Sequence, residues 1–225
     1  MPRALFCGHA AALDRAALRL TAQVRPKSRV VVFARAPVLG AVKTRLGAAI
    51  GDAAALRFHV ETMAAILRRL AREPRWDTVL GVTPDRLARH ARIGPLRVAR
   101  TPQGGGDLGR RMARALAPAR ACAPVVVVGS DIPALSAGHV ARAFAALAVH
   151  DFVFGPAEDG GYWLVGARHG ASVRGLFRDV RWSGPHALTD TLRNVPAHRR
   201  VALLETLADV DDGASFRRWR DQRVG

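Results

Sequence analysis

The sequence predicts an α/β fold in which a mixed, mostly parallel sheet carries helices on both faces. Short apolar runs alternate with segments of helical periodicity along the chain, which is the pattern of parallel strands joined by helices. The run PVVVV at 124–128 is apolar throughout, which is typical of a strand buried on both faces. At 225 residues the chain is long enough to bury one sizeable core without disulfides.

The expected elements follow from these patterns in chain order. Runs rich in valine or aromatic residues predict strands, and apolar residues at helical spacing predict helices. The predicted strands are 29–35, 76–83, 96–100, 124–129, 151–155, 161–168 and 200–204. The predicted helices are 52–72, about 109–120, about 136–149 and a final helix after 204. The polar segment 171–197 is expected to form a flap or short helices, and residues 1–27 an N-terminal extension, helical or disordered, before a domain of residues 28–225.

The net charge of +17 is carried almost entirely by arginine, because Lys27 and Lys43 are the only lysines. The arginines are spread along an alanine-rich chain, and Tyr162 is the only tyrosine. This distribution lacks the aromatic interleaving of nucleic-acid binders, so we expect no nucleic-acid partner, while the charge still suits a small anionic substrate. Cys7 and Cys122 match no disulfide or zinc spacing, which predicts a reduced, cytoplasmic protein. No apolar run approaches the length of a membrane span.

The segment APVLGAVKTRLG follows the first predicted strand and contains Pro37, Gly40, Lys43 and Arg45. A glycine-containing turn with two close cations resembles a phosphate-binding loop, although its spacing is not that of a Walker A motif. A lysine in an arginine-rich chain is informative because its compact ammonium acts as a point charge on phosphate oxygens. The alternative interpretation is a solvated turn.

A second glycine-rich segment, TPQGGGDLGRRM, follows the third predicted strand. Gly105 and Gly106 would let the backbone approach a ligand closely. Asp107 would either accept hydrogen bonds from a base or ribose or cap the following helix.

Six of the 18 acidic residues crowd three loops that follow predicted strands. Such carboxylates repel one another unless a cation neutralises them, and oxygen ligands suit Mg²⁺ or Mn²⁺. Helix capping is the alternative for the acids that precede GASFRRWR. The six are Asp131, Glu158, Asp159, Asp209, Asp211 and Asp212. Asp131 and Asp211 are the predicted metal ligands.

The segment GPAEDGGYW at 155–163 has the composition of an active-site loop. Gly160 and Gly161 would give access to an acceptor, and Tyr162 and Trp163 would provide a stacking wall. The alternative is a plain hairpin turn. His59, His139, His186 and His198 are isolated from one another and are interpreted as surface or packing residues.

Five motifs in this order resemble a bacterial family of GT-A-fold transferases. Its members are labelled radical-SAM/selenodomain-associated transferases or arsenosugar-biosynthesis glycosyltransferases, and they are similar to phospholactate guanylyltransferases. The resemblance covers about 29–220 and implies a Rossmann-like nucleotide-diphospho-sugar transferase fold with a divalent metal. The motifs are FARAPVLGAVKTRL, QGGGDLGRRM, GSDIPALS, FGPAEDGGYWLVG and DVDD.

The resemblance also implies roles for individual positions. Lys43 and Arg45 would contact the nucleotide phosphates, the 105–107 turn would lie near the base, and Asp131 would hold the metal. Glu158 and Asp159 would face the acceptor and supply the catalytic base.

Two reactions and one non-catalytic role remain open at this point. We favour a glycosyltransferase that moves a sugar from a nucleotide sugar to a small-molecule acceptor. Gly129 stands where typical metal-dependent glycosyltransferases carry the first acid of an Asp-x-Asp pair. A single acid there resembles the nucleotidyltransferase branch, which would join a nucleoside triphosphate to a phosphorylated acceptor and release pyrophosphate. The third possibility is a non-catalytic nucleotide-binding domain.

Overall fold

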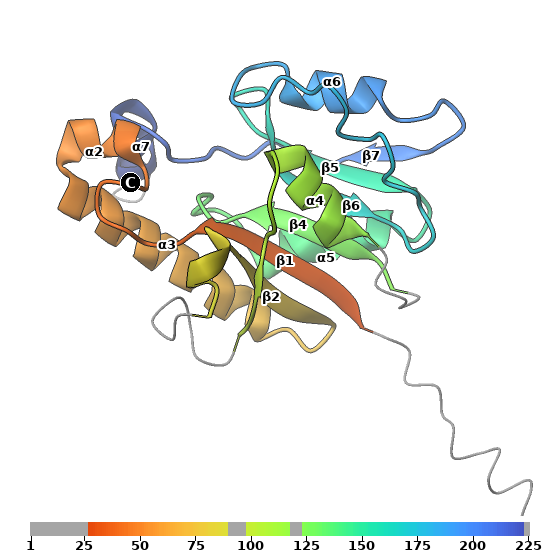
Figure 1. Cartoon of the computed structure of the whole chain (residues 1–225), viewed down its shortest axis with the longest axis horizontal. Coiled ribbons are helices and arrows are strands. Elements are labelled where there is room, and N and C mark those ends of the chain that lie inside the picture. Colours follow the sequence, from red (N-terminus) through yellow and green to blue (C-terminus); the bar gives the residue numbers. More distant parts are fainter. Residues whose placement is uncertain (1–26, 90–97, 118–122, 223–225) are drawn as a thin grey trace, which may run out of the picture.

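The computed structural model describes residues 27–89, 98–117 and 123–222, which form a seven-stranded sheet with helices on both faces (Figure 1). The strand order is β3-β2-β1-β4-β6-β5-β7. The strands are β1 Ser28–Arg35, β2 Trp76–Thr83, β3 Ala99–Pro102, β4 Val125–Gly129, β5 Phe152–Pro156, β6 Tyr162–Ala167 and β7 Val201–Leu203. The helices of the described segments are α2 Thr44–Ile50, α3 Asp52–Ala71, α4 Leu108–Leu116, α5 Ala137–Ala146, α6 Ala187–Arg193 and α7 Gly213–Asp221, with a 3₁₀ turn at Asp85–Leu87.

The sheet is mixed and mostly parallel, as the sequence predicts. β1 pairs in parallel with both β2 and β4, and its Val31 lies opposite Val79 and Val127. β6 runs antiparallel to β4 and β5. The carboxyl ends of β1 and β4 therefore meet at one edge of the sheet, which is the edge where open α/β sheets bind ligands.

Each face of the sheet is covered by its own apolar cluster, because successive strand residues point to opposite faces. Val30 and Val32 pack with α3 and α5 on one face, where Ile66 and Leu147 are buried. Val31 packs on the other face with α4, α6 and residues of the segment 171–182. The valine run of β4 is buried on both sides for the same reason.

Several predicted boundaries differ from the structure. The third strand, predicted at 96–100, is Ala99–Pro102, and α4 ends at Leu116. The helix α2 was not predicted, because a seven-residue helix is too short to show a periodic pattern. The segment 171–197 holds one short helix, α6. The N-terminal extension predicted for 1–27 lies outside the described residues apart from Lys27.

None of the helices in the described segments combines the length and the apolarity that a membrane span needs.

A buried carboxylate, Asp151, ties together the ends of β5, β6 and β7. Its Oδ1 accepts hydrogen bonds from Arg168 at 2.7 Å and Arg199 at 3.0 Å, and its Oδ2 accepts from the Arg200 backbone N–H at 2.9 Å. The Arg200 hydrogen bond is the main cause that lowers the pKa of Asp151 to about 2, and it outweighs the opposing effect of burial. This carboxylate therefore stabilises the folded chain in its ionised form.

We expect Asp151→Asn to lower the free energy of unfolding at pH 7 by about 1–3 kcal/mol, the usual cost of impairing a buried, charged hydrogen-bond partner. The wild-type advantage should be complete above the unfolded pKa of about 4. It should then fall as the pH drops toward the folded value of about 2. Urea denaturation at several pH values measures both effects, with exposed Asp77→Asn as the control. Equal stability of Asp151→Asn and wild type at pH 7 would contradict this role.

Candidate functional site

A cleft of about 950 Å³ opens at the carboxyl ends of β1 and β4. Its volume is that of a small-molecule site. Residues within five stretches of chain line it, namely 33–45, 127–132, 157–165, 182–187 and 209–211, together with His59, Leu108 and Met112. The predicted ligand edge of the sheet is therefore hollowed.

Three carboxylates converge in this cleft from two distant segments. Asp131 follows the end of β4, while Asp209 and Asp211 follow β7. The Val210 backbone N–H donates to the carbonyl oxygen of Asp131 at 3.2 Å, which holds the second segment against the first. One oxygen from each carboxylate lies within 4.8 Å of the others. Asp209 was not among the predicted metal ligands, although it belongs to the acid-rich loops.

The carboxylates influence one another strongly. Burial and the neighbouring charges of Asp211, Asp131 and Asp159 raise the pKa of Asp209 to about 6. Placing like charges this close is unfavourable unless a cation lies among them. The cluster therefore has the electrostatic character of a cation site.

Lys43 supplies a cation to this cluster. Its Nζ lies 3.2 Å from Asp131 Oδ2 and also donates to Asp211 Oδ1, and its side chain is only 8% exposed. Burial by itself would lower the pKa of Lys43, but the attraction of Asp131 and Asp211 outweighs burial and raises it. The ammonium is therefore charged in this position.

The backbone at Lys43 is left-handed, with φ 49° and ψ 43°, at the position that caps α2. This conformation costs a non-glycine residue about 1–2 kcal/mol. Such strain is typical of functional sites, where the surrounding structure maintains it. Here it accompanies a side chain that is directed toward the carboxylates.

Of the other residues in the predicted phosphate-binding loop, Pro37 and Gly40 lie in the loop before α2 and Arg45 lies in the helix. Arg45 lies in the first turn of α2, is 71% exposed, and donates to Asp211 Oδ2 at 2.9 Å. Arg45 lines the cleft, whereas Pro37 and Gly40 do not. The predicted loop therefore ends at Lys43, because α2 begins at Thr44, and its binding of phosphate stays a prediction.

Hydrogen bonds from arginines of α4 hold the glycine-rich segment at 104–106. Asp107 caps α4 by accepting the Arg110 backbone N–H at 2.8 Å, so the capping interpretation of this residue is confirmed. Arg114 donates to the Gly105 carbonyl oxygen at 3.0 Å, and Arg111 donates to that of Gly106 at 2.8 Å. Residues 105–107 do not line the cleft, although the adjacent Leu108 does. Their contact with a base remains a prediction.

The acid-rich loop 157–161 joins the antiparallel strands β5 and β6, so it is a hairpin loop that also borders the cleft. Asp159 lines the cleft, and its Oδ1 accepts the Gly161 backbone N–H at 2.9 Å. Glu158 does not line the cleft and lies 3.9 Å from Arg218 of α7. The structure therefore separates these two acids, which the sequence treats as a pair.

The two predicted stacking aromatics also separate, because neighbouring residues of a strand face opposite sides. Tyr162 packs against Phe154 and Trp182 beside the cleft, and burial raises the pKa of its hydroxyl. Trp163 is 2% exposed in the opposite apolar cluster, and its Nε1 donates to the Glu205 carbonyl oxygen at 3.1 Å. Its ring packs in the core, although Trp163 is also among the residues that line the cleft, so the aromatic wall stays a prediction.

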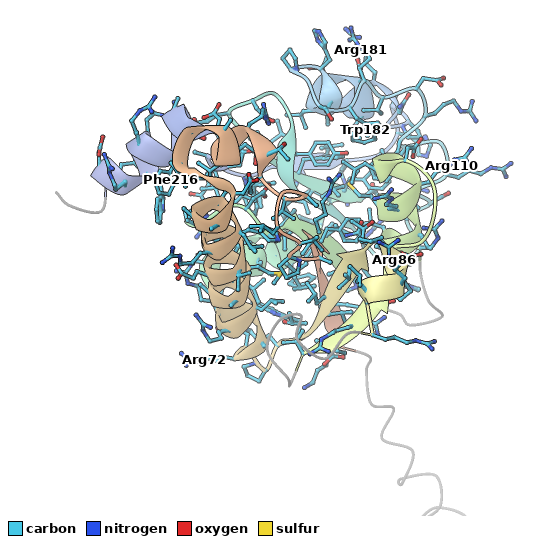
Figure 2. All side chains as sticks on the ribbon, turned by 60° about the vertical axis from the view of Figure 1, so that its left-hand side comes forward. Arg72, Arg86, Arg110, Arg181, Trp182 and Phe216 are labelled. Carbon is cyan, nitrogen blue, oxygen red and sulfur yellow. The ribbon has the colours of Figure 1, made fainter. Side chains whose placement is uncertain are left out.

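Among the cleft residues that the sequence did not assign to the site are His59, which was interpreted as a surface or packing residue, and Trp182. His59 is 4% exposed and lines the cleft, where its Nε2 bonds the Arg35 carbonyl oxygen at 2.9 Å. Its position on the apolar face of the predicted helix 52–72 is the feature of the sequence that could have indicated its burial. Trp182 lies between α6 and α4 (Figure 2) and comes from the segment whose structure the sequence left open. It adds a further aromatic residue to the cleft lining, with Tyr162 and Trp163.

A family model described as "Uncharacterized protein conserved in bacteria (DUF2064)" matches residues 66–184. This chain belongs to that family. No curated protein matches the sequence. A crystal structure from Desulfovibrio desulfuricans G20, described as a "putative nucleotide-diphospho-sugar transferase", is 31% identical to this chain, with a TM-score of 0.75 and 83% of each chain covered.

More distant structures share the fold. CMP:2-keto-3-deoxy-manno-octonic acid synthetase complexed with CTP is 12% identical, with a TM-score of 0.53, and the match covers 88% of this chain and 98% of the synthetase. The manganese complex of Rv0371C from Mycobacterium tuberculosis H37Rv is 16% identical, with a TM-score of 0.50, and the match covers 85% and 97% of the two chains. The DUF2064 protein therefore has the fold of nucleotide-diphospho-sugar transferases, as its motifs imply.

Gly160 holds the hairpin loop against the segment that carries Trp182. Its φ is +82°, and a Cβ there would lie 2.4 Å from the Pro185 carbonyl oxygen. The Leu188 backbone N–H also donates to the Gly160 carbonyl oxygen at 3.1 Å. Gly160 thus sets the distance between two walls of the cleft, which differs from the acceptor contact predicted for it.

We expect Gly160→Ala to destabilise the protein more than Gly170→Ala. Gly170 has a similar φ of +77° but open space around its Cβ position, so the two variants share backbone strain and differ in the clash with Pro185. The strain alone costs about 1–2 kcal/mol. Urea denaturation of both variants isolates the clash, and equal losses of stability would show that Pro185 moves aside freely.

Proposed function

We propose that this DUF2064 protein is a metal-dependent transferase that moves a sugar from a nucleotide-sugar donor to a small-molecule acceptor. The observation that carries the proposal is the carboxylate cluster with Lys43 and Arg45 in a cleft at the carboxyl ends of β1 and β4. A cation site beside basic side chains is suited to a nucleotide diphosphate. The name given to the Desulfovibrio relative supports this class of donor.

Asp131, Asp209 and Asp211 fit a divalent cation. Each offers a carboxylate oxygen, and the three oxygens lie within 4.8 Å of one another. Mg²⁺ and Mn²⁺ prefer such oxygen ligands and commonly bridge carboxylates and phosphates. The manganese in the distant Rv0371C structure is consistent with this choice. When bound, the cation would neutralise charge on the diphosphate leaving group.

The protein's own residues would perform the remaining steps. Lys43 and Arg45 would bind the phosphate oxygens of the donor. Asp159 is the candidate base, because it lines the cleft while one of its oxygens is fixed by the Gly161 backbone N–H. It would accept the proton of the acceptor hydroxyl as that oxygen attacks the sugar. Tyr162 and Trp182 would border the acceptor.

Nucleotidyl transfer is the second candidate, and two observations favour it. Gly129 leaves Asp131 as a single acid at the end of β4, and the structure of the synthetase that shares the fold is described as complexed with CTP. In that reaction an acceptor phosphate would attack the α-phosphorus of a nucleoside triphosphate, and pyrophosphate would leave. No base would be required, because the acceptor phosphate already carries its charge.

The two reactions differ in what they release. With Mn²⁺ or Mg²⁺, the protein should slowly release nucleoside diphosphate from one member of a panel of nucleotide sugars. Asp159→Asn should slow acceptor-dependent turnover by about 10²–10⁴-fold, the usual contribution of a positioned base, while donor binding changes little. Glu158→Gln is the matched comparison, because its carboxylate lies outside the cleft.

The contrary outcome is that the protein releases pyrophosphate from a nucleoside triphosphate and leaves every nucleotide sugar intact. That result would contradict glycosyl transfer and support nucleotidyl transfer. Failure to release either product with any donor and acceptor offered would favour a non-catalytic nucleotide-binding role.

Asp131→Ala should abolish metal-dependent nucleotide binding without unfolding the protein. Asp131 is partly exposed and its side chain contacts Lys43 across the cleft, so its loss should affect the site more than the core. Isothermal calorimetry with Mn²⁺ and the active donor measures the effect, and circular dichroism checks the fold. Asp77→Ala provides the control, because Asp77 is an exposed strand residue. Unchanged affinity in Asp131→Ala would remove this residue from the metal site.

A further inference from the structure

We propose that Lys43 acts as an internal counter-ion that competes with the divalent cation, and that nucleotide phosphate relieves this competition by drawing the lysine away. The inference rests on the proposed function, since it concerns the same metal and phosphate site. It makes metal binding at that site depend on the binding of a diphosphate. Metal alone should bind weakly, and metal with a diphosphate should bind synergistically.

The position of the Lys43 ammonium carries the first step. Its Nζ contacts Asp131 Oδ2 at 3.2 Å and donates to Asp211 Oδ1, so it bonds two of the three carboxylates that would hold the metal. The remaining oxygen of Asp211 accepts from Arg45 at 2.9 Å. Both oxygens of Asp211 are therefore engaged by cations of the protein itself.

Competition follows from the geometry. A Mg²⁺ ion binds carboxylate oxygens at about 2.0–2.1 Å. A metal on the oxygens that Lys43 contacts would therefore stand very close to the ammonium, and the two positive charges would repel. The two cations therefore compete for the same oxygens of Asp131 and Asp211 unless the lysine is offered another acceptor.

Phosphate oxygens provide that other acceptor for the lysine. The Lys43 side chain is 8% exposed, so leaving its ammonium without an acceptor inside the cleft would be costly. Its flexible four-carbon stem can carry the ammonium from carboxylate to phosphate oxygens. A diphosphate that accepts Lys43 thereby frees Asp131 and Asp211 for the metal, and linkage requires the metal to favour diphosphate binding by the same factor.

The neighbouring cation Arg45 has a different role. It is 71% exposed and contacts the outer oxygen of Asp211, so water can replace its partner at little cost. The competition is therefore assigned to Lys43, whose ammonium lies inside the cluster.

The test is the affinity for Mn²⁺ alone, measured by electron paramagnetic resonance of the free ion in the absence of any nucleotide. Lys43→Met should bind Mn²⁺ at least about tenfold more tightly than wild type, within the usual range of coupling between sites. Lys43→Arg should retain weak binding, because it keeps a cation at the cluster. Lys27→Met is the matched control, since Lys27 is the other lysine of the chain and is exposed.

Lys43→Gln serves as a second neutral variant, and circular dichroism of each protein confirms that it is folded. Repeating the titration with inorganic pyrophosphate, with the solution complex of Mn²⁺ and pyrophosphate subtracted, should strengthen Mn²⁺ binding more in wild type than in Lys43→Met or Lys43→Gln.

Equal or weaker Mn²⁺ binding by the neutral Lys43 variants would overturn the competition while leaving the metal site in place. Absence of Mn²⁺ binding by wild type and all variants, with and without pyrophosphate, would instead overturn the proposed metal-dependent function, and the inference would fall with it. The two failures are therefore distinguishable.

Discussion

The ion cluster of Lys43 with Asp131 and Asp211 joins three parts of the chain that are far apart in sequence. Asp131 is 88 residues from Lys43, and Asp211 is 168 residues from it. The carboxylates repel one another, so they remain together because a cation lies among them and because the backbone holds them in place. The fold must therefore bring the carboxylates together and also place a positive charge among them to offset their repulsion.

The scaffold meets this requirement through packing on both sides of the cluster. The parallel pairing of β1 and β4 brings Lys43 and Asp131 to the same edge of the sheet. On the other side, α7 packs beside α2 and the start of α3 (Figures 1 and 2), where Phe216 and Trp219 contact Phe58. A Cβ at Gly213 would lie 2.6 Å from that of Ala49, so this glycine permits the close approach of α7 to α2. The helices that follow Lys43 and Asp211 are thus fixed relative to each other.

Much of this arrangement is visible in the sequence. Valine runs and helical periodicity predict most of the sheet and its covering helices, and the rule that ligands bind at the strand ends places Lys43 and Asp131 in one site. The short helix α2 and the exact partners of Lys43 depend on tertiary contacts that leave no local pattern. Asp209 joins the site through the path of the chain after β7, which the sequence does not define.

Side-chain direction explains the other differences. Tyr162 and Trp163 are adjacent in sequence and both border the cleft, yet strand geometry packs their side chains in apolar clusters on opposite faces of the sheet. Asp159 and Glu158 are also adjacent, in the loop between β5 and β6, and only Asp159 lines the cleft. His59 and Trp182 enter the site through a buried helix face and an irregular segment, where the chemistry of a residue is not apparent from its neighbours.

The most direct test of the central claim is a crystal structure of the protein with Mn²⁺ and a nucleoside diphosphate, using anomalous scattering at the manganese edge. The account predicts one strong anomalous peak within coordinating distance of Asp131, Asp209 and Asp211, with the diphosphate beside it and the Lys43 ammonium on phosphate oxygens. A manganese peak elsewhere, or a nucleotide bound away from this cleft while Lys43 keeps its carboxylate partners, would contradict it.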